Sequence, residues 1–88
     1  MPELCRFDGI IIYMYFEDLE GHNKPHIHVW FGEYNASIAI DGQILAGKMP
    51  VKQLKKVSLW LSIHEEDLYK AWNLAVRNQH FDKIPPLE

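Results

Sequence analysis

The chain has little cysteine and no long apolar segment. Its 88 residues include one cysteine, Cys5, so no disulfide can form within the chain. We expect a reduced, cytoplasmic protein in which Cys5 is a small buried hydrophobic residue. No stretch approaches the roughly 18 apolar residues of a membrane-spanning helix, and the N-terminus lacks the pattern of a signal peptide. The sequence therefore gives no support to membrane insertion or secretion.

Motifs that mark common enzyme and nucleotide-binding sites are also missing. The sequence contains no Gly-rich phosphate loop, no Ser-centred nucleophile elbow, no helical His-Glu-x-x-His and no dinucleotide fingerprint. Cys5 by itself does not define a thiol enzyme, because no spacing rule connects it to a histidine. No cofactor is established by the sequence, and the one candidate is a divalent transition metal.

An excess of positive charge is absent as well. The net charge of −3 argues against nucleic-acid binding through charge alone. The charge is uneven, however, because residues 1–47 carry two basic and seven acidic side chains, whereas residues 48–88 carry seven basic and five acidic ones. Four lysines lie close together in the second part. They form either a solvated helix face or a docking patch for an acidic partner or a phosphate backbone. These lysines are Lys48, Lys52, Lys55 and Lys56.

What is present indicates one globular domain covering residues 1–88. Hydrophobic residues make up 48% of the chain and aromatic residues 12%, which is enough for one modest core. No linker, repeat or low-complexity tract divides the sequence. The pattern indicates a strand-rich part over residues 1–49, a helical part over residues 50–79 and an extended tail over residues 80–88. We expect Phe81, Ile84 and Leu87 to hold this tail against the sheet.

Short turn signals divide the first part into strands. Asp8-Gly9 and Asp41-Gly42 supply the positive φ angles of two-residue hairpins, and Gly32-Glu33 can close a third hairpin. These turns predict an antiparallel meander sheet of four to five strands. The predicted strands are Leu4–Phe7, Ile10–Phe16, His26–Phe31, Tyr34–Ile40 and Gln43–Ala46.

The second part has helical spacing. Pro50 suits the first turn of a helix, and a second apolar stripe follows a break near His64. Either Ser62 or His64 can be the N-cap of the second helix, and one kinked helix is a further alternative. The sequence therefore predicts an α+β fold with two helices packed on one face of the sheet. The first stripe contains Val51, Leu54, Val57, Leu61, Trp60 and Ile63, and the second contains Leu68, Ala71, Trp72, Ala75 and Val76.

Three of the five histidines fall close together, with His22 just ahead of His26 and His28. The spacing of His26 and His28 places both imidazoles on the same side of a strand. Neutral imidazole is a common metal ligand, and His22, Asp18 or Glu20 could supply a third ligand. Three alternatives stay open. The histidines organise the loop structurally, His26 and His28 act as catalytic acid–base or phosphate contacts, or His22, His26 and His28 bind a metal.

Strand alternation predicts the surroundings of these histidines. Ile27 and Val29 point to one face of the third strand, and His26, His28 and Trp30 point to the other. We expect the helices on the apolar face, so that the histidines form a surface site or shallow cleft away from the helices. An exposed Trp30 is typical of an interface or a base-stacking platform. The predicted partner or nucleic-acid contacts are Trp30, Lys52, Lys55 and Lys56.

A set of short motifs is spread along the chain. They are Met1-Pro2-Glu3, Arg6-Phe7-x-Gly9-Ile10, Met14-Tyr15-Phe16, His22-x-x-Pro25-His26-x-His28-Val29, Gly47-x-x-Pro50, Trp60 with His64, Trp72, and Ile84-x-Pro86-Leu87. Together these motifs resemble a family of small bacterial proteins known as domain of unknown function 4160. The resemblance covers nearly the whole chain, and the Pro-His-x-His motif is its most specific part. It implies a small, stand-alone prokaryotic protein, often encoded beside another small protein as in toxin–antitoxin pairs.

Three functions follow as hypotheses. The first is a protein-interaction module of a paired regulatory or toxin–antitoxin-like system, whose partner is a small protein from an adjacent gene. The second is a His-dependent nuclease or phosphotransfer enzyme, and the third is a metal-binding protein that uses the His-x-His pair. A homodimer through the sheet edge or the Trp30 face is a further possibility. The sequence leaves open whether the protein is an enzyme.

Overall fold

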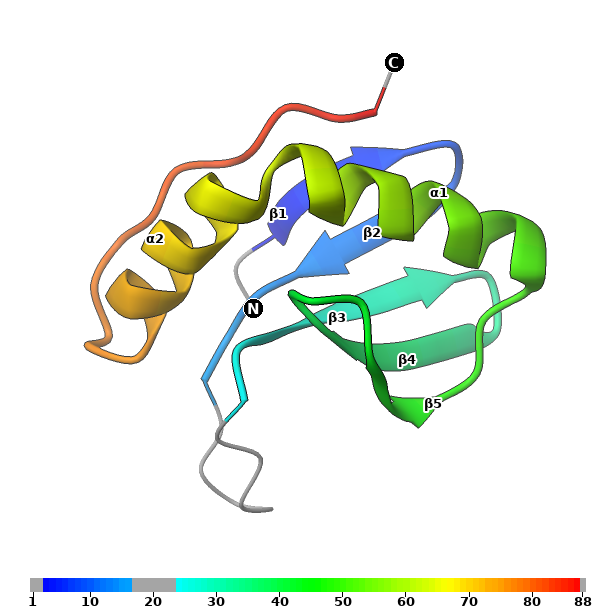
Figure 1. The fold of residues 1–88 in the computed structure, drawn as a ribbon, viewed down its shortest axis with the longest axis horizontal. Helices are drawn as coiled ribbons and strands as arrows, with labels where there is room; N and C mark the ends of the chain where they lie inside the picture. The colour runs from blue at the N-terminus through cyan, green and yellow to red at the C-terminus, as the bar shows by residue number, and fades with distance from the viewer. Residues whose placement is uncertain (1–2, 17–23, 88) are drawn as a thin grey trace.

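The computed structural model describes residues 3–16 and 24–87, which form a sheet followed by two helices (Figure 1). Each strand pairs antiparallel with its neighbour in sequence, so the sheet order is β1-β2-β3-β4-β5. The predicted α+β meander is therefore confirmed. No helix of the described residues is long and apolar enough to cross a membrane. The elements are β1 (Glu3–Phe7), β2 (Ile10–Tyr13), β3 (His26–Phe31), β4 (Tyr34–Ala39), β5 (Ile44–Gly47), α1 (Val51–Ile63) and α2 (Glu65–Ala75).

Turns with positive φ angles position the strands. Asp8 and Gly9 have φ angles of 49° and 78°, as a tight hairpin between β1 and β2 requires. Gly47 ends β5 with a φ angle of 83°. A Cβ atom at Gly47 would overlap the backbone of Asn35 and Ala36 in β4, so this close approach of the two strands requires glycine.

The strand limits differ from the prediction mainly at β2. This strand ends at Tyr13, where its pairing with His28 of β3 ends, and not at Phe16. The apolar run through Phe16 had indicated a longer strand, but burial of Met14 does not require strand pairing. Residues 14–16 therefore leave the sheet as an irregular segment.

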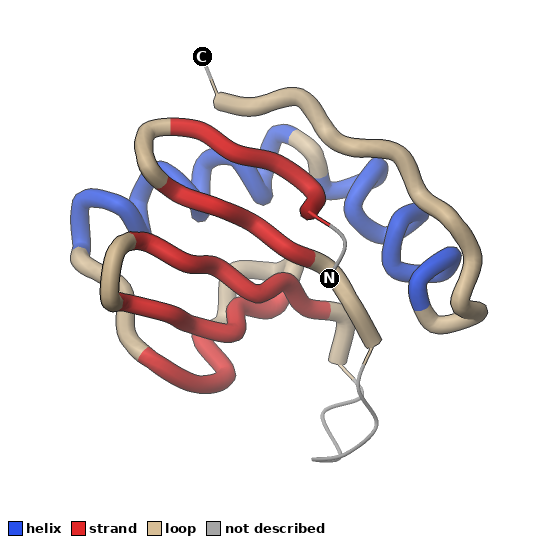
Figure 2. Tube along the Cα trace, turned by 180° about the vertical axis from the view of Figure 1, so that it is seen from behind, coloured by secondary structure: helices blue, strands red, loops and turns tan. Residues whose placement is uncertain are grey.

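The helices cover one face of the sheet and leave the other face uncovered by helix (Figure 2). Ile12, Val29 and Ile38 lie on the covered face and are fully buried. They belong to one apolar core with Val57 and Trp60 of α1. Cys5 is a free, buried thiol in this core, as expected for a small hydrophobic residue.

Two helices form, separated at His64. The backbone of His64 departs from helical geometry, with φ −109° and ψ 21°. His64 is thus the N-cap residue of α2, as one of the alternatives predicted, although its side chain makes no capping hydrogen bond. Ser62 does not cap α2, because its hydroxyl donates to the backbone carbonyl of Leu59 at 2.7 Å.

The predicted apolar stripe of α1 is correct for Val57, Trp60 and Leu61, which are buried. It is wrong for Val51 and Ile63, which are 67% and 58% exposed. At about 100° per residue these two lie roughly 80–160° around the helix from Val57 and Leu61, and so outside the buried stripe. In the second stripe Val76 is also misplaced, because it follows the end of α2 and is 39% exposed.

The C-terminal tail closes the molecule along α2 and β1 (Figures 1 and 2). The backbone N–H of Ile84 donates to the carbonyl of Leu4 at 3.0 Å, and the Trp60 indole N–H donates to the carbonyl of Pro85 at 2.8 Å. Ile84 is buried, and Phe81 and Leu87 pack against the core. The predicted role of these three side chains in holding the tail is confirmed.

Candidate functional site

His26 and His28 lie side by side at the beginning of β3. Strand pairing places Tyr13 of β2 and Ser37 of β4 on either side of His28, and Ala39 of β4 beside His26. The two imidazole centroids are 5.0 Å apart, and the ring planes meet at 72°. The i, i+2 spacing thus brings both rings together on one side of the strand.

His26 is buried, with 4% of its surface exposed. Its Nδ1 lies 2.7 Å from the backbone carbonyl oxygen of Lys24. A carbonyl oxygen only accepts hydrogen bonds, so Nδ1 carries the hydrogen, and in the neutral ring Nε2 holds the lone pair. This hydrogen bond agrees with the loop-organising role that was one of the three alternatives, because it connects the ring to the end of the preceding loop.

The expectation that His26 lies on a surface away from the helices is wrong. Its ring centroid is 5.1 Å from that of Trp72 in α2. The chain turns at His64, so α2 lies beside the end of the sheet where β2 ends and β3 begins (Figure 1). Strand alternation assigns the two faces of a sheet, but it does not reveal which element covers the end of the sheet.

His28 is half-buried beneath Tyr15, whose ring is parallel to it within 5° at a centroid distance of 4.0 Å. The Nδ1 atom of His28 lies 3.3 Å from the hydroxyl oxygen of Ser37. Its Nε2 atom is buried and has no hydrogen-bond partner among the described residues. Such an atom is unusual, because most buried polar atoms in folded proteins are paired.

Burial and, to a smaller extent, electrostatic repulsion from His26 together lower the pKa of His28 to about 4. Desolvation disfavours the charged imidazolium, which is the larger of the two causes. His28 is therefore a neutral imidazole at pH 7. A neutral ring can bind a metal or accept a hydrogen bond, but it is a poor source of protons at this pH.

The two histidines belong to a continuous series of aromatic contacts. The series runs from the uncovered sheet face to α2, through the contacts of Tyr15 with His28, His28 with His26, and His26 with Trp72. Phe16 completes it with an edge-on contact to Trp72 at 5.7 Å. The histidine pair therefore also contributes to packing between the sheet and α2.

The remaining predicted metal ligands lie outside the described residues. This holds for His22 and for the alternative ligands Asp18 and Glu20. Within residues 3–16 and 24–87, no group of three or more His, Cys, Asp or Glu side chains is arranged to hold an ion. Of the three predicted metal ligands, the structure therefore gives positions for His26 and His28.

Trp30 and the predicted lysines do not form one patch. Trp30 is 41% exposed and lies between Ile11 and Asn35 on the uncovered sheet face. The lysines belong to α1, on the other side of the sheet, where Lys52 and Lys55 are exposed. The third, Lys56, contacts the carboxylate of Asp8 at 3.0 Å. Lysine spacing alone did not indicate which side of the sheet the helix would cover.

Sequence reasoning missed a surface on α1, which we call the outer face and define as Val51, Lys52, Lys55, Leu59 and Ile63. Its three apolar side chains are 67%, 53% and 58% exposed in the order of the chain. The signal was present in the sequence, because these positions share one side of a helical wheel, opposite the buried stripe. The sequence prediction assigned Val51 and Ile63 to the same stripe as the buried residues, so this second apolar side was not recognised.

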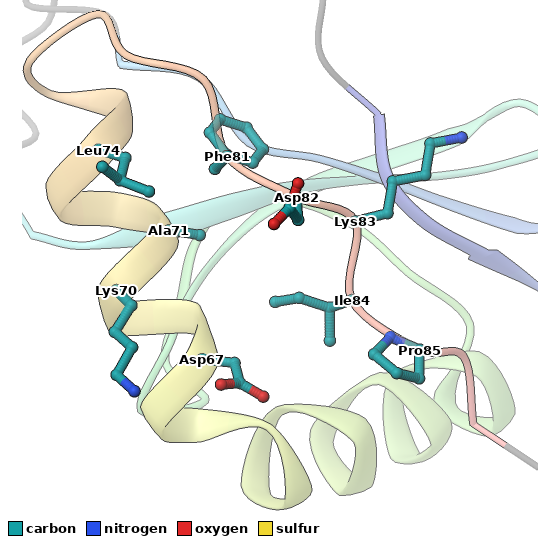
Figure 3. A pocket seen from close by; sticks show the side chains of 9 residues that line it. All are labelled: Asp67, Lys70, Ala71, Leu74, Phe81, Asp82, Lys83, Ile84 and Pro85. Atoms are coloured by element: carbon teal, nitrogen blue, oxygen red, sulfur yellow. The ribbon is translucent and has the colours of Figure 1, made fainter.

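A shallow cleft of about 290 Å³ lies between α2 and the tail (Figure 3). Ile84 points from the tail toward Ala71 of α2, and Asp67, Lys70 and Asp82 lie around the opening. The cleft is lined by charges of both signs over an apolar floor and contains neither histidine of the candidate site. It is best described as the seam where the tail packs on the helix.

Comparison with known proteins identifies a family. The model described as Domain of unknown function (DUF4160) matches residues 9–73. This range begins just before β2, includes both histidines of the candidate site and ends within α2. No curated protein and no solved structure shows a significant match. Because the family model covers well over half of the chain, the protein belongs to the DUF4160 family.

Proposed function

We propose that this protein is an interaction module of a paired regulatory or toxin–antitoxin-like system, and that it binds its partner protein through the outer face of α1. The observation that supports this is the exposure of Val51, Leu59 and Ile63 on one helix. Complete burial of such a side chain contributes about 1.5–3 kcal/mol, so a partner that covers all three gains substantial binding energy. Clustered apolar exposure of this kind is typical of interaction sites.

The charges on the outer face specify the chemistry of the partner. Its two charged side chains are Lys52 and Lys55, both exposed, and α1 contains no acidic residue. Val51 and Ile63 are about 18 Å apart along the axis, which is the length of three to four turns of a partner helix. The partner that fits is a small protein presenting an apolar helix face flanked by carboxylates.

The test is co-expression with the product of the adjacent gene, followed by co-purification and titration calorimetry. The double variant Leu59→Ser with Ile63→Ser should weaken binding at least tenfold and leave the fold intact, because both side chains are exposed. Val76→Ser, which changes an exposed apolar residue beyond α2, is the matched control and should bind normally. The absence of any complex would contradict the proposed function.

Two further variants separate this surface from the alternatives. Charge reversal of Lys52 and Lys55 to Glu should slow association and weaken its salt dependence, whereas Lys70→Glu on α2 should have little effect. If Trp30→Ser abolishes binding and the α1 variants do not, the uncovered sheet face is the interface and the assignment to α1 is wrong.

The geometry gives less support to a His-dependent nuclease or phosphotransfer enzyme. A histidine with a pKa of about 4 is a weak base, and it is not protonated to act as a general acid at neutral pH. The Nδ1 atom of His26 is engaged by the Lys24 carbonyl. His28 therefore lacks the acid–base properties that this chemistry requires near pH 7, and His26 has only its Nε2 atom left for such a role.

A further inference from the structure

We propose that His26 and His28 form a two-histidine site for a divalent transition metal, which binds the Nε2 atoms of both rings. The observation is a shared pattern of hydrogen bonding. Both Nδ1 atoms have polar partners, and the buried Nε2 atom of His28 has none among the described residues. This inference goes beyond the partner-binding function and does not depend on it.

The contacts of the Nδ1 atoms favour metal binding at Nε2. The Lys24 carbonyl fixes the hydrogen of His26 on Nδ1 and leaves the lone pair on Nε2. The Ser37 hydroxyl can accept a hydrogen bond from Nδ1 of His28, which leaves the lone pair of this ring on Nε2 as well. Metal-bound histidines usually donate their second ring N–H to a carbonyl or another acceptor, which orients the ring.

The ring geometry fits a shared ion. With a metal–nitrogen bond of about 2.0–2.1 Å, each imidazole centroid lies about 3 Å from the metal, and a tetrahedral angle then separates two centroids by about 5 Å. The observed separation is 5.0 Å. The β3 backbone holds both side chains on one side, so the pair is largely preorganised.

The ligand type limits the choice of ion. Imidazole nitrogen suits zinc, copper and nickel better than calcium or magnesium, which prefer oxygen. Among the described residues no third His, Cys, Asp or Glu joins the pair. With only these two protein ligands, the ion would be held more weakly than in a structural site with four ligands, and a chelator should remove it.

The test is titration of the untagged, full-length protein with Zn²⁺ and then Co²⁺, with the protein first freed of metal by a chelator. Calorimetry should detect one equivalent of bound metal. His26→Gln and His28→Gln should each weaken binding at least tenfold. His80→Gln is the matched control and should bind normally, because the His80 side chain is 88% exposed.

A second measurement on the unmodified protein removes any dependence on how the variants fold. With ¹⁵N-labelled histidine, Zn²⁺ should shift the Nε2 resonances of His26 and His28 far more than their Nδ1 resonances. Metal-induced shifts confined to other histidines would overturn the proposal. Unchanged affinity in both glutamine variants would overturn it as well.

Discussion

The side chain of His28 shows how one buried atom can make stability depend on pH. In the unfolded chain its pKa is near the ordinary value of 6.5, and in the folded protein it is about 4. Between these values the unfolded state binds more protons than the folded state. The free energy of unfolding therefore falls as the pH is lowered from 6.5 toward 4, and this contribution is constant above pH 6.5.

We predict that His28→Phe reduces this acid sensitivity in the metal-free protein. Phenylalanine keeps the ring that stacks on Tyr15 but has no nitrogen to protonate. Urea unfolding at pH 7, 5.5 and 4.5 measures the effect, and the stability of the variant should fall less steeply than that of the wild type. If the free energy of unfolding falls equally with pH in the two proteins, His28 is not the residue responsible.

The sequence predicted part of this site. The i, i+2 spacing correctly placed His26 and His28 together, because alternation along a strand depends only on local backbone geometry. The burial of His26 was not predictable, since it depends on Trp72, which reaches the pair only through the turn at His64. The contacts of Nδ1 with Lys24 and Ser37 likewise depend on the register of the folded sheet.

At the level of elements, α1 is apolar on two sides. One side, containing Val57 and Trp60, packs against the sheet, and the other is the exposed outer face. Apolar spacing predicted the helix itself, but it could not distinguish the two sides, because Val51 and Val57 have the same hydrophobicity. The Asp-Gly turn was more informative, since the positive φ angles at Asp8 and Gly9 follow from residue type.

We predict that the two valines of α1 respond differently to truncation. Val57→Ala should lower the free energy of unfolding by about 1–3 kcal/mol, because Val57 is fully buried. Val51→Ala should leave it nearly unchanged or raise it slightly, since alanine favours helix and Val51 is largely exposed. Urea denaturation checks both values, and similar losses would mean that α1 is oriented differently.

At the level of the whole molecule, the tail connects parts of the chain that are distant in sequence. Ile84 bonds to Leu4 of β1, and the carbonyl of Pro85 receives the indole hydrogen of Trp60. Both β1 and the tail lie outside residues 9–73, which the family model matches. Apolar residues in the tail predicted that it would pack, but the partner strand depended on β1 being at the edge of the sheet.

We predict that Ile84→Ala destabilises the whole domain. Ile84 is a tail residue whose side chain is buried in the core, so its truncation should lower the free energy of unfolding by about 2–4 kcal/mol. Lys83→Ala is the matched control and should change stability by less than about 0.5 kcal/mol, because the Lys83 side chain is 71% exposed. Thermal and urea unfolding measure both variants. A small effect of Ile84→Ala would show that the tail contributes little to stability.

The sequential order of the strands has a consequence for folding kinetics. Because every strand pairs with its neighbour in the chain, the pairings are local in sequence, and the longest connection, from β2 to β3, spans residues 14–25. The entropic cost of closing these loops is therefore low. Contact between Ile84 and Leu4, in contrast, joins opposite ends of the chain. We infer that the tail docks after the rate-limiting step. Stopped-flow measurements on Ile84→Ala should then show faster unfolding with little change in the folding rate. If the folding rate instead falls by an amount that accounts for the lost stability, the tail belongs to the folding nucleus.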